Sequence, residues 1–255
     1  MIDDTGLQPE EVVVQEASSE TQKFDSVERL DWSAIAADLD AHGHAVLTAL
    51  LTPAECDAMA HLYDGGADFR STIVMARHCF GRGEYRYFAY PLPPLVAGLR
   101  AALYPWLAPL ANEWHARMGL DARFPADHAA FIARCHAAGQ VGPTPLLLRY
   151  GSGDYNCLHQ DLYGAHVFPL QAAILLSEPG EDFEGGAFVL TEQRPRMQSR
   201  VEVVPLRKGD AVIFAVNDRP VRGGRGDYRV KMRHGVSRLR AGHRHTLGII
   251  FHDAA

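Results

Sequence analysis

Two stretches of sequence decide how this chain is interpreted. The first is Tyr150-Gly-Ser-Gly-Asp-Tyr-Asn-Cys-Leu-His-Gln-Asp161, and the second is His234-Gly-Val-Ser-Arg-Leu-Arg-Ala-Gly-His-Arg244. The first places His159 two positions before an aspartate, and residues i and i+2 of an extended strand point to the same side. The second ends on an arginine ten positions after its histidine. We expect the rest of the chain to be a scaffold that brings the two stretches together.

The period of the apolar residues changes between the two halves of the chain. Upstream of residue 142 they recur at helical spacing, as in residues 32–39 and 94–117, where Pro105 predicts a kink or break. Thr52-Pro53-Ala-Glu55 has the signature of a capped helix start. Downstream, short apolar runs separated by Gly, Pro and Asp indicate antiparallel strands, as in a barrel or sandwich. We therefore predict a mainly β fold with helical support.

The expected domain organisation follows from this change of period. Residues 1–24 are polar and acidic, and we expect them to form a mobile acidic tail. Residues 25–255 are expected to form a single domain. Within it, residues 25–140 would be mainly helical support, and residues 141–255 would form the β-core that carries the metal site.

Composition restricts the function classes. The chain has 255 residues, 47% hydrophobic content and a net charge of -6, and an acidic balance does not favour nucleic-acid binding by bulk electrostatics. Its four cysteines form no close pair, which indicates reduced, mostly buried thiols in a reducing compartment. The N-terminus lacks a signal-peptide pattern, and no apolar run approaches the ~20 residues of a membrane span. We expect a cytoplasmic protein with no membrane partner.

Two imidazoles and one carboxylate form the ligand set that holds ferrous iron on one face and leaves the opposite positions open. An H-x-D triplet alone is a weak signal among 13 histidines and 31 acidic residues, and a strand-end histidine bonded to a loop aspartate is the alternative. The second stretch strengthens the metal interpretation, because His234 and Arg244 would face one interior if their strands are neighbours. A guanidinium grips a carboxylate with two hydrogen bonds, so Arg244 suits a dicarboxylic acid.

The order of these motifs resembles that of the 2-oxoglutarate/Fe(II)-dependent dioxygenases, above all their prolyl-hydroxylase-like branch. The resemblance covers roughly residues 144–253 and includes Gly185-Gly186-Ala-Phe188 and Lys208-Gly209-Asp210. It implies a double-stranded β-helix core of the jelly-roll or cupin-like kind, packed on the N-terminal helices. Family members that halogenate carry a small residue at the position of Asp161, so the carboxylate here favours hydroxylation or oxidative demethylation.

The resemblance implies a role for each matching residue. The metal ligands that carry catalysis would be His159, Asp161 and His234. Arg244 matches the residue that pairs with the distal carboxylate of 2-oxoglutarate. Tyr150 matches a tyrosine that donates a hydrogen bond to this co-substrate, and Tyr155 is a second candidate for that role.

The implied activity is hydroxylation of a C–H bond in a protein side chain or small molecule, with succinate and CO2 as co-products. The cofactors would be Fe(II), 2-oxoglutarate as co-substrate and O2, with ascorbate as a candidate reductant. Two alternatives stay open: an oxidative demethylase of nucleic-acid bases, and a cupin-like zinc hydrolase or binding protein. Arg244 argues against zinc, because zinc hydrolysis needs no buried dicarboxylate partner. Residues 77–87 and 191–200 are candidate substrate contacts, and residues 219–229 are expected to form a flexible basic loop.

Overall fold

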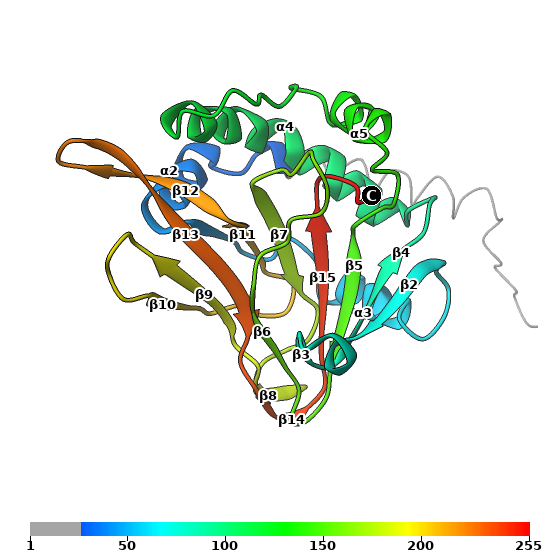
Figure 1. Cartoon of the computed structure of the whole chain (residues 1–255). Coiled ribbons are helices and arrows are strands. Elements are labelled where there is room, and N and C mark those ends of the chain that lie inside the picture. The colour runs from blue at the N-terminus through cyan, green and yellow to red at the C-terminus, as the bar shows by residue number, and fades with distance from the viewer. Residues whose placement is uncertain (1–26) are drawn as a thin grey trace, which may run out of the picture.

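The computed structural model describes residues 27–255, so the acidic tail expected over residues 1–24 lies outside the described residues. Helices α2, α4 and α5 lie along one side of the molecule, and antiparallel strands form most of the remainder (Figure 1). The helices within residues 27–255 are α2 (Trp32–His42), α3 (Pro53–His61), the 3-10 helix η1 (Met75–His78), α4 (Pro94–Arg117) and α5 (His128–Ala137). None of these helices combines the length and the apolar character that a membrane span needs.

Local chemistry explains where the helices begin and end. The Thr52 side chain accepts from the backbone N–H of Glu55, whose carboxylate accepts from the Thr52 backbone N–H, so the capping box predicted for α3 is confirmed. Helix α4 continues through Pro105 and Pro109, so of the kink or break expected at Pro105 the break does not occur. Both prolines lie on the exposed face of α4, so the carbonyls of Ala101 and Pro105 that lose their helical partners lie on the solvent side.

Two sheets form the β-structure. The larger has the order β1-β11-β7-β15-β5-β4-β2 and the smaller has the order β10-β9-β13-β6-β3, with β12 paired to β13. The strands of the larger sheet are β1 (His44–Leu47), β11 (Ala211–Ala215), β7 (Leu170–Leu175), β15 (Arg244–Ile250), β5 (Leu146–Tyr150), β4 (Glu84–Phe88) and β2 (Phe69–Val74). Those of the smaller sheet are β10 (Arg200–Val204), β9 (Phe188–Gln193), β13 (Gly226–Val236), β6 (Tyr155–His159), β3 (Gly81–Arg82) and β12 (Asp218–Gly223). A separate pair joins β8 (Phe183–Gly185) to β14 (Leu239–Gly242).

Strands from residues 25–140, the half expected to be mainly helical support, also join the two sheets. Strand β1 pairs with β11, and β4 pairs with both β2 and β5, so the upstream half completes the larger sheet as well as supplying helices. Strand β3 likewise extends the smaller sheet beside β6. The flexible loop expected over residues 219–229 was also wrong, because β12 and β13 form a hairpin there and pair across a tight turn between Gly223 and Gly226. This hairpin projects from the body of the molecule in Figure 1.

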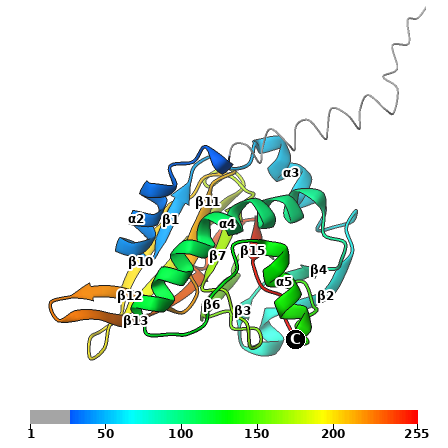
Figure 2. The ribbon, with the colours of Figure 1, turned by 90° about the horizontal axis from the view of Figure 1, so that it is seen from above.

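The larger sheet is covered on both faces. Strands β7 and β11 are buried along their whole length, as expected for strands without a solvent face. Helix α4 runs across one side of this sheet (Figure 2) and turns a buried stripe toward it that includes Leu99, Leu103 and Leu107. The smaller sheet lies on the other side. Two of the four cysteines, Cys79 and Cys157, are exposed, so the expectation of mostly buried thiols held only for the other two.

Candidate metal centre and co-substrate pocket

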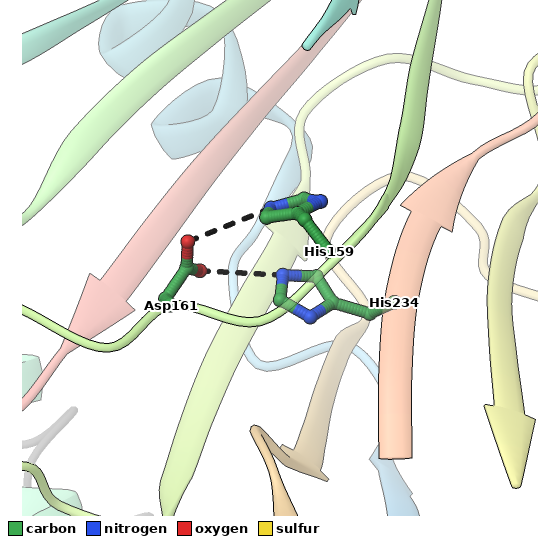
Figure 3. A group of neighbouring side chains, drawn as sticks. All are labelled: His159, Asp161 and His234. Atoms are coloured by element: carbon green, nitrogen blue, oxygen red, sulfur yellow. Dashed lines mark ion pairs between the residues drawn. The ribbon is translucent and has the colours of Figure 1, made fainter. Parts of the chain in front are cut away.

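The two histidines predicted as ligands face each other across one strand pair. His159 ends β6, and it is the direct register partner of His234 in β13. Asp161 follows two residues after His159, and its carboxylate faces the two imidazoles from one side (Figure 3). The Nε2 atom of His159 lies 3.5 Å from Asp161 Oδ1, and the Nε2 atom of His234 lies 3.3 Å from Oδ2. One ligand atom from each residue lies within 4.8 Å of the others, so the three residues can hold one metal ion.

The imidazole of His159 presents the form that a metal ion needs. His159 Nδ1 lies 2.8 Å from the carbonyl oxygen of Cys157, so Nδ1 carries the proton and donates it, and Nε2 keeps its lone pair. Burial, followed by the charge of His234, lowers the pKa of His159 and favours the neutral ring. His234 is packed beside Phe214, and its Nδ1 atom is buried without a hydrogen-bond partner among residues 27–255.

Asp161 lies beyond the end of β6, and two side chains hold its carboxylate. The Tyr163 hydroxyl donates to Oδ1 at 2.6 Å, and the Gln171 carboxamide donates to Oδ2 at 2.8 Å. Burial alone would raise the pKa of Asp161, but the hydrogen bond and charge of His234, the charge of His159 and the Tyr163 hydroxyl outweigh it and lower that pKa. The carboxylate is therefore ionised, as a metal ligand must be.

Across the cavity, the larger sheet supplies the other predicted pair. Arg244 in β15 and Tyr150 in β5 are register partners, and their side chains are 1% and 0% exposed. Burial lowers the pKa of Arg244 to about 10, and the guanidinium remains charged at neutral pH. Its Nη1 donates to Thr246 Oγ1 at 2.5 Å, while its Nε has no partner and no carboxylate of residues 27–255 forms an ion pair with it. The Tyr150 hydroxyl is also buried without a partner.

These residues line one cavity of about 220 Å³ between the two sheets. The metal-binding triad lies on the side of the smaller sheet, and Arg244 and Tyr150 lie on the side of the larger sheet. Aromatic side chains make up much of the remaining wall: Phe80, Tyr85, Tyr87, Tyr163, Phe188 and Phe214. Three of these come from the segment 77–87 predicted to face substrate, whereas no residue of the segment 191–200 lines this cavity.

Tyr155 is the one predicted site residue that the structure does not bring into the cavity. Its side chain is 37% exposed, and its neighbour Asn156 lines the cavity instead. Strict alternation along β6 would have placed Tyr155 on the same face as His159. The register shifts between these positions, because His159 pairs with His234 but Asn156 pairs with Val236, which leaves one extra residue in β6. That bulge reverses the alternation and turns Tyr155 outward.

Sequence reasoning missed the two residues that hold Asp161. Tyr163 follows Asp161 at the same two-residue spacing that linked His159 to Asp161, and this spacing was an available signal. Gln171 lies in the fully buried strand β7, where a lone polar residue in an apolar run could have been singled out.

The donor set fits an iron centre with 2-oxoglutarate beside it. Neutral imidazole nitrogens and an ionised carboxylate are the ligands of the facial two-histidine, one-carboxylate site. The guanidinium of Arg244, whose Nε lacks a partner, and the hydroxyl of Tyr150 are donors that line the same cavity, and they match the acceptors of a carboxylate. A water-sized or apolar occupant would leave the buried positive charge uncompensated.

Comparison with known proteins gives one family match. Residues 83–254 match the model of Oxygenase-NA, a family described as an oxygenase catalysing oxidative methylation of damaged DNA. Two uncharacterised proteins of Mycobacterium tuberculosis, from strains CDC 1551 and H37Rv, are each 49% identical to the chain over 168 residues. The match covers 66% of this chain and 72% of each relative.

Solved structures share the architecture at low sequence identity. An oxidoreductase of the 2OG-Fe(II) oxygenase family from Burkholderia pseudomallei has a TM-score of 0.53 at 15% identity, covering 89% of this chain and 94% of its own. A Trichoplax adhaerens prolyl hydroxylase, in complex with a hypoxia inducible factor peptide fragment, has a TM-score of 0.51 at 16% identity. The match covers 89% of this chain and 91% of the hydroxylase. A Pseudomonas putida prolyl-4-hydroxylase has a TM-score of 0.50 at 13% identity, and the match covers 88% of this chain and 99% of that hydroxylase. These likenesses concern the fold, and they confirm the predicted jelly-roll core with helical support.

Proposed function

The chain belongs to the Oxygenase-NA family and is a 2-oxoglutarate-dependent dioxygenase, and on that premise we propose how its own residues divide the work. The metal ligands are His159, Asp161 and His234. Arg244 and Tyr150 bind 2-oxoglutarate on the opposite wall of the cavity. The reaction converts a substrate C–H bond, 2-oxoglutarate and O2 into a C–OH bond, succinate and CO2.

The buried charge of Arg244 is the observation that carries this proposal. A guanidinium that is 1% exposed and pairs with no carboxylate of the described chain is costly unless a ligand supplies the anion. That anion must enter the cavity that the His-Asp-His triad also lines. A zinc hydrolase or simple metal-binding barrel gives no reason for such a charge beside the metal ligands.

The chain contributes binding, orientation and a dry environment. Bound Fe(II), with O2 and 2-oxoglutarate, would supply the oxidising power that inserts oxygen into a C–H bond. Arg244 and Tyr150 fix the co-substrate by hydrogen bonds from the larger sheet. Phe188 and Phe214 cover the apolar side of the cavity beside His234 and keep water from it.

For the primary substrate, we place an alkylated nucleic-acid base ahead of a protein side chain or small molecule. The family description, which refers to damaged DNA, supports this order. The overall acidity is no objection, because residues 1–26 hold seven acidic residues and one basic residue and so account for the whole net charge of -6. Residues 27–255 are formally neutral.

The cavity rim also fits a base. Phe80 lines the cavity, yet it is 47% exposed and stacks on His78 with ring centroids 5.3 Å apart. Arg77 and Arg82 are exposed on either side of it in the sequence. An aromatic ring flanked by arginines is the usual platform for single-stranded nucleic acid, with stacking worth about 1–3 kcal/mol per base. A peptide substrate is the second candidate, supported by the peptide complex of the Trichoplax neighbour, which shares the fold.

Succinate formation that depends on a defined substrate tests the proposal. The protein, Fe(II), 2-oxoglutarate and ascorbate are incubated with a single-stranded oligonucleotide that carries one N-methylated base, with the unmethylated oligonucleotide, or with a proline-containing peptide. Hydroxylation of an N-methyl group releases formaldehyde, so the expected result is equal amounts of succinate and formaldehyde with the methylated strand alone. Asp161→Ala should abolish both products. Turnover with the peptide alone would reverse the order of the two substrate classes, and equal turnover by Asp161→Ala would contradict the assigned metal ligand.

A further inference from the structure

The position of the Asp161 carboxylate depends on side chains outside the metal-binding triad. Strand β6 ends at His159, so no strand pairing fixes Asp161. Its Oδ1 atom accepts from Tyr163 at 2.6 Å, and its Oδ2 atom accepts from Gln171 at 2.8 Å. Gln171 is anchored in β7, an interior strand of the larger sheet, whereas Tyr163 lies in a segment without helix or strand. The Tyr163 ring packs beside Tyr87 and His252, but its backbone needs an anchor of its own.

Gln140 provides that anchor. This residue follows α5 and is 1% exposed. Its Nε2 atom reaches the carbonyl oxygens of Tyr163 at 3.0 Å, His166 at 3.1 Å and Asp253 at 2.6 Å, and its Oε1 accepts from the backbone N–H of His166 at 2.7 Å. The segment from 163 to 166 is therefore tied to the C-terminal residues through one carboxamide.

The packing around Gly164 shows how closely this segment fits against Gln140. Gly164 has φ +100°, which L side chains rarely adopt, and a Cβ at this position would lie 2.5 Å from the Gln140 carboxamide carbon. A side chain here would have to displace Gln140 or the segment itself. The backbone conformation of Gly164 and its close contact with Gln140 therefore both favour a single arrangement of residues 163–166.

We propose that Tyr163 is a positioning residue for Asp161, and that Gln140 acts on the metal site through Tyr163. This inference rests on the proposed function, because it takes Asp161 as a metal ligand. The partners that orient a ligating carboxylate typically change metal affinity by 10- to 100-fold when they are removed. The Tyr163 hydroxyl belongs to this class, and Gln140 determines whether that hydroxyl reaches Oδ1.

The first experiment measures binding of Mn(II), a redox-inert probe, by equilibrium dialysis of the full-length apo-protein. Tyr163→Phe removes only the hydroxyl, and its dissociation constant for Mn(II) should rise roughly 10- to 100-fold. Tyr104→Phe is the matched control, since Tyr104 lies outside the cavity and its hydroxyl donates to the carbonyl oxygen of Pro125 at 3.0 Å, and its dissociation constant should match the wild type. Equal Mn(II) binding by Tyr163→Phe and wild type would overturn the inference and leave the proposed function standing. Failure of the wild type itself to bind Mn(II) would overturn both.

The second experiment asks whether Gln140 acts through Tyr163. Gln140→Leu should weaken Mn(II) binding in the wild-type background but have no further effect in the Tyr163→Phe background. Additive losses in the double variant would mean that Gln140 acts by another route, and they would overturn that part of the inference. Gly164→Ala perturbs the same segment without removing Gln140, so it provides the same comparison if Gln140→Leu does not fold.

Discussion

Replacing Arg244 with methionine should make the ligand-free protein more stable. Burial lowers the pKa of this guanidinium to about 10, well below its ordinary value. At 1.36 kcal/mol per pKa unit, holding the charge in the cavity costs the folded state about 3 kcal/mol. Methionine has a similar length and no charge, and it forfeits the hydrogen bond to Thr246, which is worth about 1 kcal/mol. The expected net change is therefore a stabilisation of about 2 kcal/mol.

The order of stability should reverse when 2-oxoglutarate is present. A ligand that binds only the folded state at 100 times its dissociation constant stabilises by about 2.7 kcal/mol. The wild type should gain this stabilisation with 2-oxoglutarate and Mn(II), whereas Arg244→Met should gain only the part that Mn(II) provides alone. The measurement is urea unfolding of both proteins with Mn(II) alone, with Mn(II) and 2-oxoglutarate, and without either.

A second buried arginine supplies the control. Arg100 is 2% exposed, like Arg244, but its Nη2 pairs with Asp253 at 2.7 Å. Arg100→Met leaves that buried carboxylate without its cation, so it should lose about 3–5 kcal/mol, with or without 2-oxoglutarate. If Arg244→Met is destabilised like Arg100→Met, and 2-oxoglutarate stabilises it as much as the wild type, the reasoning about an uncompensated charge is wrong.

Two further predictions follow from buried polar contacts. Gln171→Leu removes the donor to Asp161 Oδ2 and should weaken Mn(II) binding roughly 10- to 100-fold in equilibrium dialysis, with an unchanged affinity speaking against that contact. Glu192 is buried and ion-paired with Arg219; burial alone would raise its pKa, but hydrogen bonds from Arg194 and Arg219 lower it. A lowered carboxyl pKa stabilises the folded state above the unfolded pKa, and this stabilisation is lost as the pH falls through the folded pKa. The difference in unfolding free energy between wild type and Glu192→Gln, measured with urea, should therefore shrink from pH 7 to pH 3. A gap that widens toward pH 3 would contradict this sign.

The parts of the site that could be predicted from sequence depend on local rules. The i and i+2 spacing of His159 and Asp161, the strand period around His234 and the arginine ahead of an apolar strand are all properties of short segments. The capping box at Thr52 is local in the same way. Such features survive folding because neighbouring residues largely determine them, and the resemblance in motif order added the co-substrate role of Arg244.

The remaining parts depend on register and on contacts between distant segments. Tyr155 was misplaced because a bulge in β6 shifts the alternation, and a bulge is set by pairing with β13 rather than by β6 itself. Gln171 lies 10 residues after Asp161, and Gln140 lies in the segment that follows α5. No local pattern connects either residue to the site. The hairpin of β12 and β13 was mistaken for a loop because its glycines and arginines resemble a solvated segment, although they flank a tight turn.

Anaerobic titration of the apo-protein with Fe(II) and 2-oxoglutarate tests the central claim most directly. A metal-to-ligand charge-transfer band in the visible requires iron and 2-oxoglutarate to be bound to each other in one site. The wild type should show this band, His159→Ala should lose it, and Arg244→Met should need a higher concentration of 2-oxoglutarate to reach it. A folded wild type that shows no band, or a His159→Ala variant that retains it, would contradict the assignment of this cavity as the iron and 2-oxoglutarate site.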